Sequence, residues 1–226
     1  MEKPDVAQEV ERTAQRYQTD AYASTYKNEY EDGWKLRNLR SRLVASAEIH
    51  AVTKALDGAR LEGAILDIPC GTGKLGGTLS RYPVRITAAD LSAEMMKLAR
   101  EEYDEEKIDD FIVCDAAELP MEDGSLDSVI CLRLTQRLPV EFRARVLAEF
   151  RRVVTRSLIV SYSVSSPWHD LRGRLRWLYD RSDPTLFPAR RREIEQELNQ
   201  AGFSIVDVRK VLPAISSQII VTARPI

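Results

Sequence analysis

The sequence predicts an α/β protein built on one mostly parallel sheet, and three features of the chain carry that prediction. Short apolar runs of strand length recur from Ala64 onward, candidate helices separate most of them, and the last two runs are joined by a connection too short for a helix. Strands that alternate with helices form parallel sheets covered on both faces. Two strands joined directly pair antiparallel, so we expect seven strands with the last one reversed.

The expected strands cover residues 64–68, 85–90, 110–115, 126–132, 157–162, 203–212 and 217–225. Helices are expected at 5–18, 35–56, 74–81, 92–103, 139–154 and 188–202. Ser92 is well placed to cap the helix that follows it. Right-handed crossovers place the carboxyl ends of the parallel strands along one edge, where ligands of open α/β sheets bind.

The chain length of 226 residues fits a single domain with an added segment. We expect an N-terminal helical cap over residues 1–60 and a main body over residues 61–226. A segment of the body at about 164–188 has apolar residues at helical spacing with arginines between them. This pattern predicts a lid over the site.

Composition excludes several classes of protein. The chain has 33 basic and 35 acidic residues, a balance that argues against a general nucleic-acid binder. Three cysteines without a C-x-x-C pair, and only two histidines, argue against a disulfide framework or a metal site. From its polar N-terminus we expect no signal peptide, and no run reaches the roughly 18 apolar residues of a membrane span. We expect a cytoplasmic protein, and peripheral contact with a membrane stays open.

The stretch "ILDIPCGTGKLGG" at residues 65–77 is a glycine-rich loop that directly follows the first strand. A nucleotide-binding P-loop requires a glycine where Ile68 stands and a hydroxyl where Leu75 stands, so that interpretation fails. Gly71, Gly73 and Gly76 formally match a dinucleotide fingerprint, but Asp67 would then face a pyrophosphate of the same charge. A cofactor that carries a cation at this place, such as S-adenosylmethionine with its sulfonium and ammonium groups, suits Asp67 better.

The residues "LDIPCGTGKLGGTL" resemble the first motif of the class I S-adenosylmethionine-dependent methyltransferases, and the resemblance covers nearly everything from Ala64 to the C-terminus. It implies a Rossmann-like fold with strand order 3-2-1-4-5-7-6 and S-adenosylmethionine as the cofactor. Pro69 stands where the family usually has glycine, which stiffens the turn without blocking it.

The resemblance also implies roles for acidic residues at successive strand ends. Asp90 would accept the ribose hydroxyls, and Asp115 with the N–H of Ala116 would bind the adenine. Each acidic residue could instead cap a helix or start a turn. The complete set of expected cofactor-binding residues is Asp67, Pro69, Cys70, Gly71, Gly73, Asp90, Leu91, Asp115, Ala116, Leu132, Tyr22 and Arg37. Within it, Cys70 is interpreted as a small packing residue rather than a nucleophile.

The acceptor of the methyl group is less well defined by the sequence. His169, a few residues past the fifth strand, is the candidate catalytic base, and the alternative is a solvated histidine of the lid. Tyr162 could face the substrate or pack in the core. No N-P-P-Y motif is present, which disfavours N-methylation of adenine or glutamine.

These observations favour a methyltransferase, monomeric or homodimeric, that acts on a small-molecule or lipid- or glycan-linked acceptor. Its basic, aromatic lid favours an anionic or amphipathic acceptor, and O-methylation is the simplest reaction. The alternatives are C-methylation of a quinone-like ring, a non-catalytic cofactor-binding partner subunit, and an NAD(P)-binding oxidoreductase.

Overall fold

The computed structural model of the chain describes residues 36–165, 187–212 and 216–226, with side chains from residue 43 onward. The expected helix at 5–18, most of the N-terminal cap and most of the expected lid lie outside the described residues. In the described part of the chain, no helix has both the length and the apolar character needed to cross a membrane.

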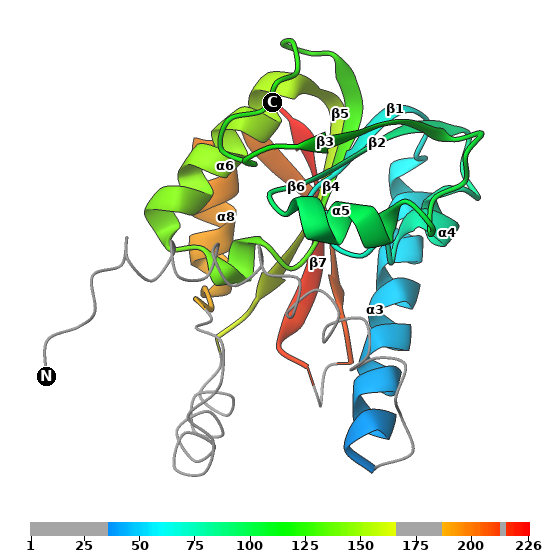
Figure 1. Cartoon of the computed structure of the whole chain (residues 1–226). Helices are drawn as coiled ribbons and strands as arrows, with labels where there is room; N and C mark the ends of the chain where they lie inside the picture. Colours follow the sequence, from blue (N-terminus) through cyan, green and yellow to red (C-terminus); the bar gives the residue numbers. More distant parts are fainter. Residues whose placement is uncertain (1–35, 166–186, 213–215) are drawn as a thin grey trace, which may run out of the picture.

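Seven strands form one sheet in the order β3-β2-β1-β4-β5-β7-β6 (Figure 1). The strands are β1 (Gly63–Asp67), β2 (Val84–Asp90), β3 (Ile108–Val113), β4 (Leu126–Cys131), β5 (Val154–Ser163), β6 (Phe203–Lys210) and β7 (Gln218–Pro225). Strand β7 pairs antiparallel with both β5 and β6, and the other pairs are parallel. The expected fold class, strand order and reversed last strand are therefore confirmed.

The helices are α3 (Leu36–Ala59), α4 (Gly76–Leu79), α5 (Ala93–Ala99), the 3-10 turn η1 (Thr135–Arg137), α6 (Val140–Val153) and α8 (Arg191–Gln200). The expected cap is present at α5, where the Ser92 side chain accepts a hydrogen bond from the Met95 N–H (3.2 Å). Helix α3 extends past the expected residue 56 and ends at Ala59. The next residue, Arg60, has a left-handed conformation (φ 53°) that terminates the helix. The Leu61 N–H then bonds back to the Leu56 carbonyl.

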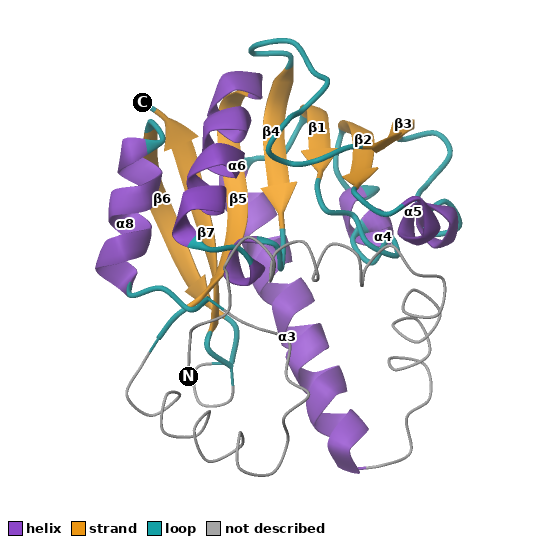
Figure 2. Ribbon diagram, turned by 60° about the vertical axis from the view of Figure 1, so that its left-hand side comes forward, coloured by secondary structure: helices purple, strands orange, loops and turns teal. Residues whose placement is uncertain are grey.

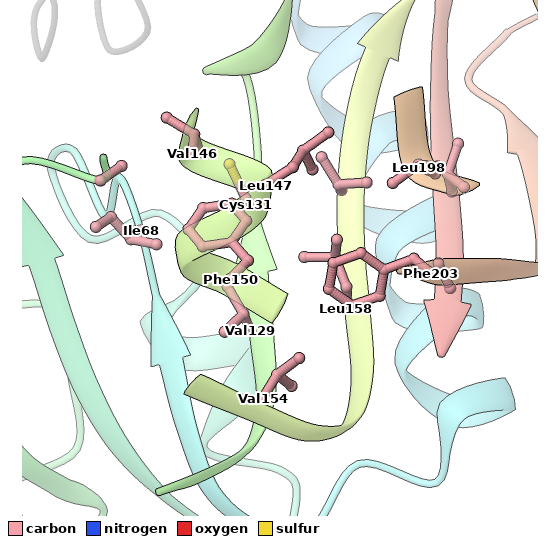
Figure 3. Packing of buried hydrophobic residues seen from close by; sticks show 14 of the residues in the cluster. Ile68, Val129, Cys131, Val146, Leu147, Phe150, Val154, Leu158, Leu198 and Phe203 are labelled. Carbon is pink, nitrogen blue, oxygen red and sulfur yellow. The ribbon is translucent and has the colours of Figure 1, made fainter. Parts of the chain in front are cut away.

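Apolar side chains fill both faces of the sheet. Helices α6 and α8 cover one face, and α3, α4 and α5 cover the other (Figure 2). Neighbouring residues of β1 divide between the two layers, because Ile65 packs on the α3 side and Leu66 on the α6 side. Figure 3 shows the layer under α6, where Phe150 and Leu147 lie against β4 and β5. The two layers fix the strand ends whose loops form the site.

Candidate functional site

A cavity of about 500 Å³ lies at the carboxyl edge of the parallel strands. Its walls come from the segments that follow β1, β2, β3 and β4, together with residues of α3 and α6. This volume is typical of sites for cofactors and small molecules. The position agrees with the edge at which right-handed crossovers gather the loops of an α/β sheet.

The glycine-rich loop forms the floor of the cavity through Gly71, which has a positive φ of 56°. Its N–H donates to Asp90 Oδ2 (2.8 Å), so the loop is tied to the end of β2. A Cβ atom built on Gly71 would meet no protein atom within 4 Å and would extend into open space. The loop therefore presents bare backbone to whatever occupies the cavity.

Asp90 lies at the end of β2 and is almost fully buried. Its Oδ1 accepts from the Ser92 N–H (2.9 Å), while its Oδ2 accepts from Gly71. Burial raises the pKa of Asp90, and the backbone hydrogen bonds oppose that shift. Each carboxylate oxygen has a second lone pair. Asp90 can thus shape the loop and still accept a ligand hydroxyl.

Asp67 ends β1 and lies in the cavity wall with only 1% of its surface exposed. The Tyr103 hydroxyl donates to its Oδ2 (2.5 Å). Burial raises the pKa of Asp67 from its ordinary value to about 7, the Tyr103 hydrogen bond lowers it, and the nearby Asp90 raises it. A buried carboxylate in this state would be stabilised in its charged form by a cation in the cavity.

The segment after β3 supplies the far wall. Asp115 is exposed, and its Oδ1 accepts from the Ala117 N–H (2.9 Å), which makes a local turn. Ala116 is buried beside it, and both residues line the cavity. Leu91 and Leu132 contribute apolar surface after β2 and β4.

The structure brings most of the expected cofactor-binding residues into one cavity wall. They are Asp67, Pro69, Cys70, Gly71, Asp90, Leu91, Asp115, Ala116 and Leu132. Gly73 does not line the cavity, because it packs against the end of α5, where a Cβ would meet Glu102 Cβ at 2.7 Å. Tyr22 and His169 lie outside the described residues, as does the side chain of Arg37.

Two residues whose roles the sequence left open have defined surroundings. Tyr162 is 1% exposed and packs in the core under α6, so it does not face the cavity. Cys70 is buried with its Sγ 3.2 Å from Met96 Sδ. Burial and the neighbouring carboxylates raise the pKa of the Cys70 thiol, so the thiolate needed for a nucleophile is disfavoured and the packing role fits.

Comparison with known proteins adds independent observations. The family model described as a methyltransferase domain matches residues 65–157. The crystal structure of magnesium protoporphyrin IX methyltransferase from Synechocystis PCC 6803 with bound S-adenosylhomocysteine superposes with a TM-score of 0.78 at 20% identity, covering 93% of this chain and 97% of that one. Human N-acetylserotonin methyltransferase in complex with S-adenosylmethionine gives 0.67 at 21% identity, covering 92% and 57%.

Residues 65–157 therefore match a methyltransferase domain, and the chain has the Rossmann-like fold of the class I methyltransferases. Curated relatives of this domain include the ubiquinone biosynthesis O-methyltransferase of Xanthomonas campestris pv. campestris (strain B100), 35% identical over 91 residues. That match covers 39% of this chain and 36% of the relative, so only about a third of the relative's length is matched. The enzyme of Xanthomonas axonopodis pv. citri (strain 306) is 36% identical over 86 residues, 36% of each chain.

The cavity also has a charged cluster that the sequence did not predict. Glu48 of α3 is buried in the cavity wall and accepts hydrogen bonds from Arg133, which follows β4, and from Gln218 of β7. Arg133 Nε lies 3.0 Å from Glu48 Oε1. Glu48 is one of several charged residues along α3, so no pattern in the sequence marks it, and its partners lie 85 and 170 residues away along the chain.

Lys74 of the glycine-rich loop belongs to the same end of the cavity. Burial and then the nearby Arg133 lower the pKa of Lys74 to about 8, while Glu48 opposes the shift. Two cationic side chains, those of Lys74 and Arg133, thus lie near the buried Glu48 carboxylate at this end of the cavity. This end of the cavity could bind an anionic group, whereas the strand ends at Asp67 and Asp90 favour a cationic one.

Proposed function

We propose that the protein transfers the methyl group of S-adenosylmethionine to the oxygen of a small-molecule or lipid- or glycan-linked acceptor. The observation that carries the proposal is the single cavity in which bare backbone at Gly71 adjoins acidic residues at three successive strand ends. Backbone without a side chain admits close approach of a ligand, and buried carboxylates suit its cationic and hydroxyl groups.

The order of the strand ends supports one orientation of the cofactor. Adenine would lie near Asp115 and Ala116, the ribose near Asp90, and the methionine portion near Asp67 and the loop. When bound, S-adenosylmethionine supplies an electrophilic methyl group on a sulfonium. The protein's part is to bind and orient the cofactor and to exclude water from the reacting pair.

The acceptor is proposed to be anionic or amphipathic. The described cavity wall combines apolar side chains with basic ones from the segment after β4 and from α6; the basic ones there are Arg133, Arg137 and Arg145. The similarity to ubiquinone biosynthesis O-methyltransferases favours oxygen as the methylated atom. C-methylation of a quinone-like ring is the alternative, and His169 stays a prediction as the base.

A thermal-shift screen followed by a transfer assay tests this function. S-adenosylhomocysteine should raise the melting temperature and NAD should not, because a ligand at 100 times its Kd stabilises by about 2.7 kcal/mol. Radiolabelled methyl transfer from S-adenosylmethionine to fractionated lipid and small-molecule extracts should then give a labelled product. Stabilisation by S-adenosylhomocysteine without any product would favour a non-catalytic partner subunit, and stabilisation by NAD alone would favour an oxidoreductase.

Asp90→Ala is expected to weaken cofactor binding by about 1.5–3 kcal/mol, the range for hydrogen bonds to a charged group. The variant loses the proposed ribose acceptor and also the bond from the Gly71 N–H. Isothermal titration calorimetry with S-adenosylhomocysteine measures the effect. The matched control is Asp109→Ala on β3, whose exposed carboxylate pairs with Arg85 outside the cavity. Unchanged affinity in a folded Asp90→Ala protein would mean that the ribose lies elsewhere.

A further inference from the structure

Tyr103 holds Asp67 from outside the cavity. It lies beyond the C-terminal end of α5, does not line the cavity, and is 5% exposed. Its hydroxyl is the one side-chain donor that the described part of the chain gives to the Asp67 carboxylate. Because both groups are buried, this hydrogen bond is shielded from water and strengthened relative to an exposed one.

The turn that carries Tyr103 is fixed by close packing against the glycine-rich loop. A Cβ on Gly73 would lie 2.7 Å from Glu102 Cβ, and a Cβ on Gly76 would lie 2.3 Å from the Glu102 carbonyl oxygen. Because both positions are glycines, Glu102, the residue next to Tyr103, can pack directly against the loop. On its other side, the Tyr103 ring packs edge-on against Phe111 of β3, with centroids 5.6 Å apart.

The groups that face Asp67 come from every element around it. Asp90 on β2 opposes its ionisation, and the thiols of Cys70 in the loop and Cys131 on β4 are themselves affected by its charge. Among the described residues, only Tyr103 acts in the opposite direction, because its hydrogen bond favours the ionised carboxylate. No cationic side chain in the described residues is a principal influence on Asp67. In the described part of the chain, the Tyr103 phenol is therefore the one group that stabilises the ionised form of Asp67 before a cation occupies the cavity.

We infer that Tyr103 is a positioning residue for the cofactor: its hydrogen bond holds Asp67 in the cavity wall and favours the ionised carboxylate, so that capture of a cationic cofactor depends on pH. The inference rests on the proposed function. The proton and the cofactor's cationic groups compete for the same carboxylate, so affinity falls as the pH falls through the pKa of Asp67, about 7 in the empty site.

Removal of the Tyr103 hydroxyl should shift the loss of cofactor affinity to higher pH. In Tyr103→Phe the carboxylate loses the donor that lowers its pKa, so protonation begins to compete at a higher pH. Calorimetric titrations with S-adenosylmethionine and S-adenosylhomocysteine from about pH 5.5 to 8.5 measure the affinity of each variant as a function of pH. We expect affinity to be about tenfold lower than wild type near pH 6.5, with the difference narrowing toward pH 8.5.

Two controls separate this role from packing. Tyr82→Phe removes a hydroxyl that bonds Asp57 outside the cavity, and it should leave the pH profile of binding unchanged. Asp67→Asn should remove most of the pH dependence around neutrality. The carboxyl-carbon NMR titration of Asp67 in the wild-type protein, with and without S-adenosylhomocysteine, requires no variant and should show a pKa near 7 that falls on binding.

The outcomes are distinct. A folded Tyr103→Phe protein whose binding has the wild-type pH profile, or an Asp67 pKa that does not fall on binding, overturns the inference and leaves the proposed function standing. Absence of binding by the wild-type protein at every pH overturns the proposed function, and the inference with it.

Discussion

Gly71→Val is expected to abolish binding of S-adenosylmethionine and S-adenosylhomocysteine. The valine side chain would extend into the open space above the loop, where the structure has no protein atom within 4 Å and where the cofactor is proposed to lie. The position also has a φ of 56°, which a β-branched residue adopts only with strain. The Gly71 N–H that bonds Asp90 would be displaced with the loop. Calorimetry should show a loss of at least about 100-fold, equivalent to about 2.7 kcal/mol.

A second glycine of the same region provides the control for this prediction. Gly77 in α4 is exposed, has no neighbouring atom within 4 Å of a built Cβ, and lacks a positive φ. Gly77→Val should therefore fold and bind the cofactor almost as the wild type does. Gly71→Ala should give an intermediate loss, because it adds one methyl group at the same place. Normal affinity in a folded Gly71→Val protein would contradict the loop's assignment as the cofactor floor.

The strands and their acidic ends could be predicted because both depend on local patterns. Buried parallel strands appear as continuous apolar runs, and in a parallel sheet the carboxyl ends of such runs meet at one edge. It was therefore possible to predict, without any knowledge of side-chain packing, that Asp67, Asp90 and Asp115 lie around one cavity. The reversed last strand followed in the same way from the short connection between β6 and β7.

The remaining features depend on contacts between distant parts of the chain. Gly73 and Gly76 look like cofactor-binding glycines in sequence, but steric contact with Glu102 explains both. The Tyr103 hydroxyl reaches Asp67 across 36 residues, and no periodicity marks it. Helix α3 carries Glu48 to Arg133 only because the helix packs across β5, β6 and β7. Such pairings appear only when the layers are assembled.

Arg143→Met is expected to lower the free energy of unfolding by about 3–5 kcal/mol, the cost of leaving one member of a buried ion pair uncompensated. Arg143 of α6 binds Glu197 of α8 through two hydrogen bonds, Nε to Oε2 (2.9 Å) and a terminal nitrogen to Oε1 (2.6 Å). The side chains are only 6% and 9% exposed. The guanidinium also donates to the carbonyls of Leu138 (2.8 Å) and Phe187 (3.3 Å), which the variant leaves without this donor. Urea denaturation of the folded variant measures the loss.

The double variant Arg143→Met/Glu197→Leu distinguishes a buried charge from lost packing. Replacing both partners by apolar residues removes the uncompensated carboxylate, so much of the stability lost in Arg143→Met should return. The exposed pair of Arg191 and Glu195 on α8 is the matched control, and Arg191→Met should change stability by no more than about 0.5 kcal/mol. If the double variant is as unstable as Arg143→Met alone, the lost bonds from Arg143 to the two carbonyls, rather than its charge pair, account for the destabilisation. Since α6 lines the cavity through Phe142 and Val146, cofactor affinity in the double variant would then fall together with stability.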